Sequence, residues 1–138
     1  MSLYIVTKVE DEDYAIEIDK VQSIEKIMKI TRVPKAKSYV EGVVNIRGDI
    51  IPIISLREKL GFNKNQLKDK NRIVILKHDD ILIGIIVDSA NEIVEIDEKN
   101  LDVTEDNDNS ITGLNMVDKI CKIGNRILLI VNLDKLIS

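Results

Sequence analysis

Short runs of alternating or continuous apolar residues recur along the chain, and polar residues separate them. This period of two and the abundance of β-branched Ile and Val are typical of strands rather than helices. Pairs of these runs flank short polar turns and predict hairpins: residues 3–9 with 14–18, 43–47 with 50–56, and 73–76 with 81–87. In the second hairpin, glycine at the first position of a Gly48-Asp49 loop predicts a type II′ turn.

Two short helical turns are predicted from capping residues. Ser55 is followed three residues later by Glu58, which is the spacing of a capping box, and Gly61 suits a left-handed stop after the turn. Asn132 can cap residues 133–137 in the same way. The polar segments 63–70 and 97–112 are predicted to be loops.

The two halves of the chain resemble each other. Residues 16–19 followed by Ile24 align with residues 85–88 followed by Ile93 at equal spacing, and residues 50–56 align with residues 127–133. Ile-rich strands can resemble one another by chance, but here the helix caps also match. We therefore predict an all-β chain in which a small barrel of five strands is duplicated, with the boundary between the halves near residues 61–72.

Composition and charge exclude several classes of protein. The chain of 138 residues carries a formal net charge of −4 and only four aromatic residues, so it lacks the basic surface and stacking side chains of a nucleic-acid binder. No apolar run is long enough to insert into a membrane, and the first residues have no signal-peptide pattern. With a single cysteine and therefore no internal disulfide, the expected location is the cytoplasm.

Candidate chemistry is sparse. His78, the only histidine, lies in a predicted turn without a base or nucleophile nearby in the pattern, so we expect a solvated loop residue. Cys121 lies in an apolar segment and is expected to be a small core residue. The acidic run Asp102, Glu105, Asp106 and Asp108 lacks the glycine and final glutamate of a calcium loop, and a solvated loop is expected. We predict no catalytic residue, no metal and no cofactor.

The segment from Tyr39 through Gly42-Val43-Val44-Asn45-Ile46-Arg47-Gly48 to Ile54, preceded by Val33-Pro34, resembles the signature of the CheW-like family of chemotaxis coupling proteins. Residues 83–88, Thr112-Gly113 and the closing segment 127–136 also match the family pattern, so the resemblance covers the whole chain. It implies two intertwined five-stranded SH3-like barrels with short helical turns, forming one domain over residues 1–138 without catalysis.

The resemblance also implies partners and a site. Family members bridge the cytoplasmic tip of methyl-accepting chemoreceptors and the regulatory domain of the histidine kinase CheA. The matching partner-binding positions in this sequence are Ile18, Val21, Ile24, Arg47 and Val87. Because a spacing of three does not suit a regular strand, at least one of Ile18, Val21 and Ile24 should leave the core and be available to a partner.

The sequence departs from the family pattern at three positions. Lys37 stands where a second proline is usual, and Ser55-Leu56 replaces Asp-Leu, an exchange between two good helix caps. Ser23 stands where many members have a glutamate that can pair with the signature arginine. Arg47 therefore needs a different partner, or it acts in holding the turn.

Two other functions remain as alternatives to an adaptor. Small β-barrels often bind nucleic acids, although the acidity and the shortage of aromatic residues speak against this use here. An enzyme would need convergent carboxylates with displaced pKa values in a cleft, which a sequence does not reveal.

Overall fold

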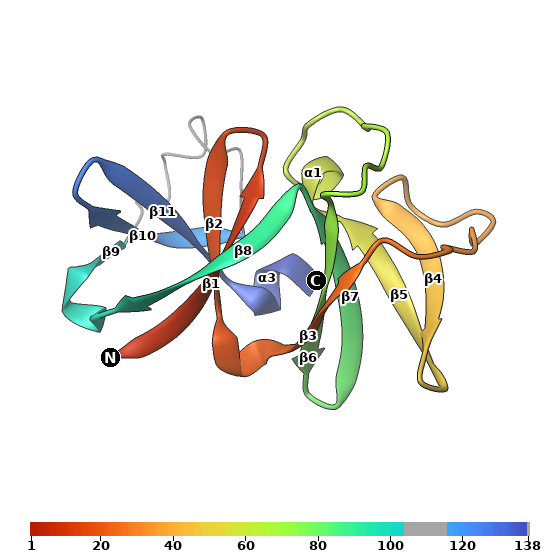
Figure 1. The fold of residues 1–138 in the computed structure, drawn as a ribbon, viewed down its shortest axis with the longest axis horizontal. Coiled ribbons are helices and arrows are strands. Elements are labelled where there is room, and N and C mark those ends of the chain that lie inside the picture. Colours follow the sequence, from red (N-terminus) through yellow and green to blue (C-terminus); the bar gives the residue numbers. More distant parts are fainter. Residues whose placement is uncertain (104–115, 138) are drawn as a thin grey trace.

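Two β-sheets, each curled into a small barrel, lie side by side along the long axis of the molecule (Figure 1). The structure is a computed structural model that describes residues 1–103 and 116–137. The five-stranded barrel contains β3 (Val21–Lys26), β4 (Val40–Ile46), β5 (Asp49–Ser55), β6 (Arg72–His78) and β7 (Ile81–Val87). The six-stranded barrel contains β1 (Ser2–Val9), β2 (Glu12–Glu17), β8 (Ser89–Ile96), β9 (Leu101–Val103), β10 (Val117–Ile123) and β11 (Arg126–Val131). The short helical elements are η1 (Ile18–Lys20), α1 (Leu56–Lys59), η2 (Glu98–Asn100) and α3 (Leu133–Ile137).

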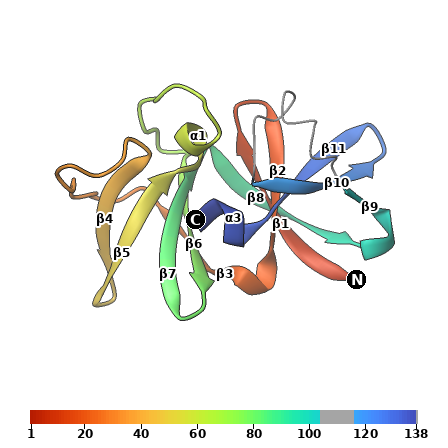
Figure 2. The same cartoon turned by 180° about the vertical axis from the view of Figure 1, so that it is seen from behind.

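The barrels are intertwined because the amino-terminal hairpin joins the carboxyl-terminal strands. β1 pairs with β8, and β2 pairs in parallel with β11, so the chain begins in the six-stranded barrel, builds the five-stranded one, and returns. Figure 2 shows β10 and β11 beside β2 from the opposite side. The predicted all-β pair of SH3-like barrels is confirmed, with β9 as a sixth strand in one of them. The predicted boundary at residues 61–72 falls between α1 and β6, and the five-stranded barrel extends on both sides of it.

The strand register reproduces the repeat seen in the sequence. The repeat matches each strand of one sheet with a strand of the other: β3 with β8, β6 with β1, β7 with β2, β5 with β11, and β4 with β10. These matched strands follow one another in the same order across the two sheets. Ile24 lies opposite Val74 in one barrel, and its aligned residue Ile93 lies opposite Ile5 in the other. The parallel strand pairs agree as well. Residue 53 on β5 lies opposite residue 84 on β7, and the aligned residues 130 on β11 and 15 on β2 lie opposite each other in the same way. A chance resemblance between Ile-rich strands does not produce matching registers, so the duplication is confirmed.

Three apolar cores hold the fold together. Among residues 1–103 and 116–137, seven buried apolar residues lie in the interior of each barrel, whereas fifteen form a core shared between the barrels. The shared core takes one face of β1, β2, β6 and β7 together with residues of α1 and α3. Cys121 lies in the interior of the six-stranded barrel as predicted, and burial raises the pKa of its thiol. Because the largest core lies between the barrels, we infer that neither barrel is stable alone.

Both predicted helix caps are formed. The Ser55 Oγ accepts a hydrogen bond from the backbone N–H of Glu58 at 3.2 Å, and the Asn132 Oδ1 accepts one from Lys135 at 3.2 Å. The second half of the predicted capping box is absent, because the backbone N–H of Ser55 donates to the carbonyl of Tyr39 at 2.8 Å instead. The cap therefore also ties α1 to the segment before β4.

The turn between β4 and β5 differs from the prediction by one residue. Ile46 pairs with Asp49, so the two-residue loop is Arg47-Gly48 rather than Gly48-Asp49. Both loop residues have positive φ, 50° and 88°, as in a type I′ turn. The N–H of Gly48 donates to the Oδ1 of Asn45 at 3.2 Å, which helps to hold this conformation. The result is that the signature arginine stands at the tip of the hairpin in a left-handed conformation.

Gly42 allows a close backbone contact at the start of β4. It follows a bulge between residues 40 and 42 and has a φ of 146°. A Cβ atom here would lie 2.1 Å from the carbonyl oxygen of Thr31, which bridges Val43 through hydrogen bonds of 2.9 and 2.8 Å. No side chain fits there, so the bridge that closes the five-stranded barrel requires glycine at this position.

We expect Gly42→Ala to destabilise the protein by roughly 3 kcal/mol or more, because backbone rather than a flexible side chain must move. The matched control is Gly61→Ala, which shares a positive φ of 90° but has open space around the new methyl group. It should cost only about 1–2 kcal/mol. Urea unfolding of both variants measures the difference, and equal losses would show that the Thr31 contact is unimportant.

Candidate functional site

A bulge in β3 places two of the predicted site residues on one face. Val21 lies opposite Leu76, and after the bulge Ile24 lies opposite Val74. Leu76 and Val74 both point into the shared core, so Val21 and Ile24 share that face although they are three residues apart. Val21 is half-buried against the core, whereas Ile24 is 39% exposed because β3 is an edge strand. Ile24 is therefore exposed because of its edge position and not because of the spacing of three, since the bulge returns both residues to one face. That Ile24 contacts a partner stays a prediction.

Ile18 and Val87 differ in accessibility although the repeat aligns them. Ile18 begins the short helical turn η1, where the chain crosses from β2 to β3, and its side chain is half-buried. Val87 ends β7 and is only 1% exposed within the shared core. Val87 therefore offers no surface to a partner in this conformation, and its contribution is to the packing beneath the surface.

Ile93, the residue that the repeat aligns with Ile24, is a further exposed apolar residue that was not among the predicted site residues. Ile93 lies on β8, the edge strand equivalent to β3, and is 58% exposed. β3 and β8 both lie on the near side of the molecule in Figure 1, one on each side of the junction between the barrels. We call Ile18, Val21, Ile24 and Ile93 the junction face. The repeat alignment was the signal in the sequence that could have pointed to Ile93.

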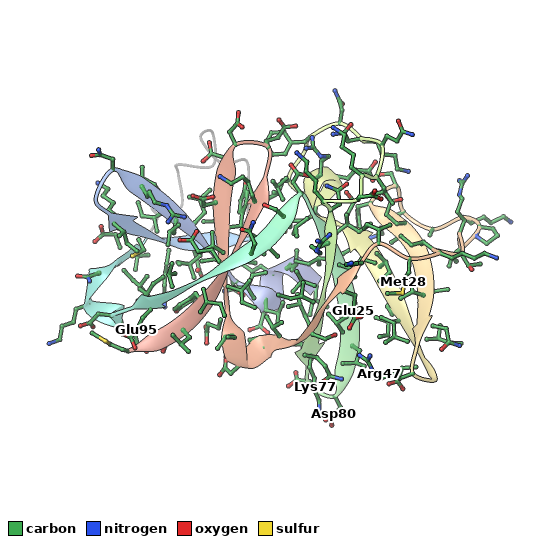
Figure 3. The ribbon with its side chains drawn as sticks, viewed as in Figure 1. Glu25, Met28, Arg47, Lys77, Asp80 and Glu95 are labelled. Carbon is green, nitrogen blue, oxygen red and sulfur yellow. The ribbon has the colours of Figure 1, made fainter. Side chains whose placement is uncertain are left out.

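Arg47 pairs with Glu25, which takes the place of the glutamate that many family members have where this chain has Ser23. Its Nη2 lies 3.2 Å from the Oε2 of Glu25 on β3, which joins the hairpin tip to the edge strand (Figure 3). Glu25 follows Ser23 by two residues on β3 and points to the same side of the strand. It can therefore reach the hairpin in place of a side chain at position 23. The Ser23 Oγ is buried and has no hydrogen-bond partner among the residues that the structure describes. The Arg47 side chain remains 70% exposed, so the pair leaves it accessible.

The six-stranded barrel has a related and more extensive ion pair. Arg126, at the start of β11, donates to both carboxylate oxygens of Glu92 on β8 at 2.8 and 2.9 Å and to Asp13 at 3.2 Å. Hydrogen bonds to Glu92 and then to Asp13 raise the pKa of Arg126, and the Arg126 hydrogen bond lowers the pKa of Glu92. Glu92 is the residue that aligns with Ser23 in the repeat. Each barrel thus has an arginine–glutamate pair between an edge strand and a hairpin, β3 with the β4–β5 hairpin in one barrel and β8 with the β10–β11 hairpin in the other.

Further ion pairs join α1 to the other barrel. Arg57 donates to Glu10 at the tip of the β1–β2 hairpin and, at 3.0 Å, to Asp88 between β7 and β8. Burial alone would lower the pKa of Arg57, but hydrogen bonds and charge from Glu10 and Asp88 outweigh it and raise the pKa. Asp88 also accepts from the backbone N–H of Glu10 at 2.9 Å. These contacts fix the barrels to each other on one side of the junction.

His78 was predicted to be a solvated loop residue, and this was wrong. It ends β6, is half-buried, and its Nε2 lies 2.9 Å from the Oδ1 of Asp134 in α3. Asp134 directly follows the segment that aligns with residues 50–56, so it occupies the place of Arg57 in the second copy. The helix of each copy therefore contacts the hairpin of the other, through an arginine facing carboxylates in one copy and a carboxylate facing a histidine in the other. The sequence could not show this contact because it joins residues 56 positions apart through the fold.

The surface has two polar hollows near these contacts. One, about 230 Å³ in volume, is lined by residues that include Glu10, Arg57 and Asp88, and the other is lined by residues that include His78 and Asp134. Among the described residues, no group of three or more histidine, cysteine or acidic side chains is placed to hold a metal ion. Residues 105–108 of the predicted acidic loop lie outside the described residues.

None of the helices within residues 1–103 and 116–137 has the length and apolar character needed to cross a bilayer.

Two intertwined SH3-like barrels built from an internal repeat, with apolar residues exposed on their edge strands, define the architectural class of the chain. The chain belongs to the family of CheW-like domains, whose profile matches residues 3–138. Both the family resemblance and the predicted fold are thereby confirmed.

Similar proteins agree with this assignment. The chain is 35% identical over 134 residues to the chemotaxis protein CheW of Bacillus subtilis, covering 97% of this chain and 85% of that protein. It is 30% identical over 138 residues to the chemotaxis protein CheW of Thermotoga maritima, covering 95% and 84%. The crystal structure of the scaffolding protein TtCheW from Thermoanaerobacter tengcongensis matches with a TM-score of 0.85 and 28% identity over 96% of this chain and 84% of that one.

We expect Arg57→Met to lower the free energy of unfolding by roughly 2 kcal/mol, because it leaves two carboxylates without their cation at a partly buried contact. Arg47→Met serves as the control, since its more exposed pair should contribute less than about 0.5 kcal/mol. Urea unfolding at neutral pH measures both variants. If Arg47→Met is as destabilising as Arg57→Met, the helix contact contributes no more to stability than the exposed hairpin pair does.

Proposed function

We propose that this chain is a cytoplasmic chemotaxis adaptor that couples methyl-accepting chemoreceptors to the histidine kinase CheA by binding both. The observation that carries the proposal is the match to CheW-like domains over residues 3–138, together with chemotaxis relatives at up to 35% identity across nearly the whole chain. The description of a structural neighbour as a scaffolding protein agrees with it. The adaptor has no catalytic step, and its effect on signalling comes from holding other proteins together.

The junction face supports binding of a receptor tip. Its exposed apolar residues lie on two edge strands whose positions are fixed by the large shared core, so the surface is rigid before a partner arrives. Preorganised apolar contacts favour binding because little conformational entropy is lost. Ile24 and Ile93 make the contact, Val21 and Ile18 support it from below, and buried Val87 keeps the underlying packing in place.

The kinase requires a second surface, and the exposed hairpin tip at Arg47 is a candidate. The tip is held by the Glu25 pair and a left-handed turn, and its guanidinium remains accessible. A fixed planar donor of this kind suits carboxylates or carbonyl groups on a partner. Arg47 therefore combines a structural role within the hairpin with a contact role outside it.

We expect Ile24→Lys to weaken binding of a receptor cytoplasmic fragment by about tenfold or more, because it places a charge in an apolar contact. Its stability should change by less than about 1 kcal/mol, since the residue is partly exposed. Ile123→Lys is the matched control, with an exposure of 40% on the far hairpin of the other barrel. Co-sedimentation with the receptor fragment and urea unfolding provide the two readings. Equal binding by the two variants would remove the junction face from the proposal.

Isothermal titration with the regulatory domain of the organism's own CheA tests the other half of the proposal. Saturable one-to-one binding is expected, and Arg47→Ala should weaken it without lowering the melting temperature. No binding between two folded proteins would contradict the coupling function and leave only the fold and family established. A large drop in melting temperature for Arg47→Ala would assign that residue to the turn instead of the contact.

A further inference from the structure

The two barrels carry opposite charge. Residues 21–87, which form the five-stranded barrel, contain thirteen Lys and Arg against seven Asp and Glu. The rest of the chain contains seven Lys and Arg against seventeen Asp and Glu. The modest net charge of −4 therefore conceals a basic half and an acidic half, and each half produces its own local potential.

The positive charge is concentrated between β3 and β4. From residue 26 to residue 40 the chain contains no acidic residue, and five cations follow one another: Lys26, Lys29, Arg32, Lys35 and Lys37. All five are exposed. No ion pair within the described part of the chain involves any of them, and only Lys37 has a ring contact, 5.9 Å from the centre of Tyr39. We call residues 26–37 the basic segment.

The basic segment is anchored although most of it is irregular. Ile27, Met28 and Ile30 pack against the interior of the five-stranded barrel, and Figure 3 shows Met28 turned toward that interior. Next to them, Thr31 is bridged to Val43 by two backbone hydrogen bonds. With these side chains directed inward, the cations are held on the outer side. Figures 1 and 2 agree that the segment lies at the end of the molecule away from the six-stranded barrel.

We propose that the basic segment is a docking surface for an acidic surface of another protein. Exposed cations without partners in the chain are available to carboxylates, and the guanidinium of Arg32 can bind one through two hydrogen bonds. Anchoring of the backbone reduces the entropy lost when the contact forms. Such a surface accelerates association and sets orientation more than it adds affinity.

The charge distribution favours a protein over a membrane or nucleic acid. An extended anionic surface would also face the acidic barrel, which carries a large excess of carboxylates and would be repelled. A local acidic patch engages only the basic end of the molecule and avoids this repulsion within a screening length. The segment adjoins the junction face only at Lys26, which lies two residues after Ile24 on β3, and the rest of it lies beyond that strand. The proposal does not depend on the identity of the receptors or the kinase.

The test uses a fluorescein-labelled glutamate homopeptide as the acidic probe and compares two double variants of the full chain. Lys29→Glu/Arg32→Glu reverses two charges in the basic segment, and Lys68→Glu/Lys70→Glu reverses two exposed charges elsewhere in the same barrel. Fluorescence anisotropy at low salt should show that the first variant binds about tenfold or more weakly than the unchanged protein. The second should retain most of the binding. Urea unfolding confirms that both variants are folded.

Equal losses in the two variants would overturn the proposal, because the attraction would then belong to the whole barrel rather than to the basic segment. Absence of binding by the unchanged protein would overturn it as well. A second arm replaces the peptide with phosphatidylserine vesicles. Binding to vesicles that exceeds binding to the peptide and disappears in the segment variant would identify an anionic membrane, not a protein, as the partner.

Discussion

The shared core between the barrels is the constraint on which the rest of the structure depends. Because β1 and β2 pair with strands from the other end of the chain, neither half of the sequence can complete a barrel alone. The exchange brings the two barrels together, and among the described residues the core between them contains more buried apolar residues than the interior of either barrel. The two barrels therefore form one rigid unit, and surfaces built across their junction keep a fixed geometry.

Duplication explains how this small protein acquired several different surfaces. The two copies share strand order, register and helix caps, yet their exposed positions have diverged. Where Arg57 contacts acidic residues in one copy, Asp134 contacts His78 in the other. Where Ile18 is accessible, the aligned Val87 is buried. A repeated scaffold thus presents unlike faces, which suits an adaptor that must distinguish its partners.

The two barrels differ in charge, and this difference gives the molecule an electrostatic orientation that its apolar contacts do not provide. The basic barrel and the acidic barrel orient the molecule in the field of a charged partner, whereas the apolar junction supplies short-range contact. Weak individual contacts become effective when several act together on one assembly, since the second contact forms at a high effective concentration. A scaffold with separate charged and apolar surfaces can therefore bind firmly without any single large interface.

The three hairpins, the capping residues Ser55 and Asn132, the duplication and the core location of Cys121 were predictable from the sequence, because each depends on local spacing and on residue chemistry within a few positions. The exact turn between β4 and β5 and the strand β9 were not. The burial of Val87, the pairing of Arg47 with Glu25 and the contact of His78 with Asp134 were not predictable. They depend on the bulge in β3, on the exchange of strands and on the packing of α3, which bring together residues that local spacing does not relate. Ile93 stands between these cases, since the repeat aligned it with Ile24 but only the tertiary structure showed that both are exposed on edge strands.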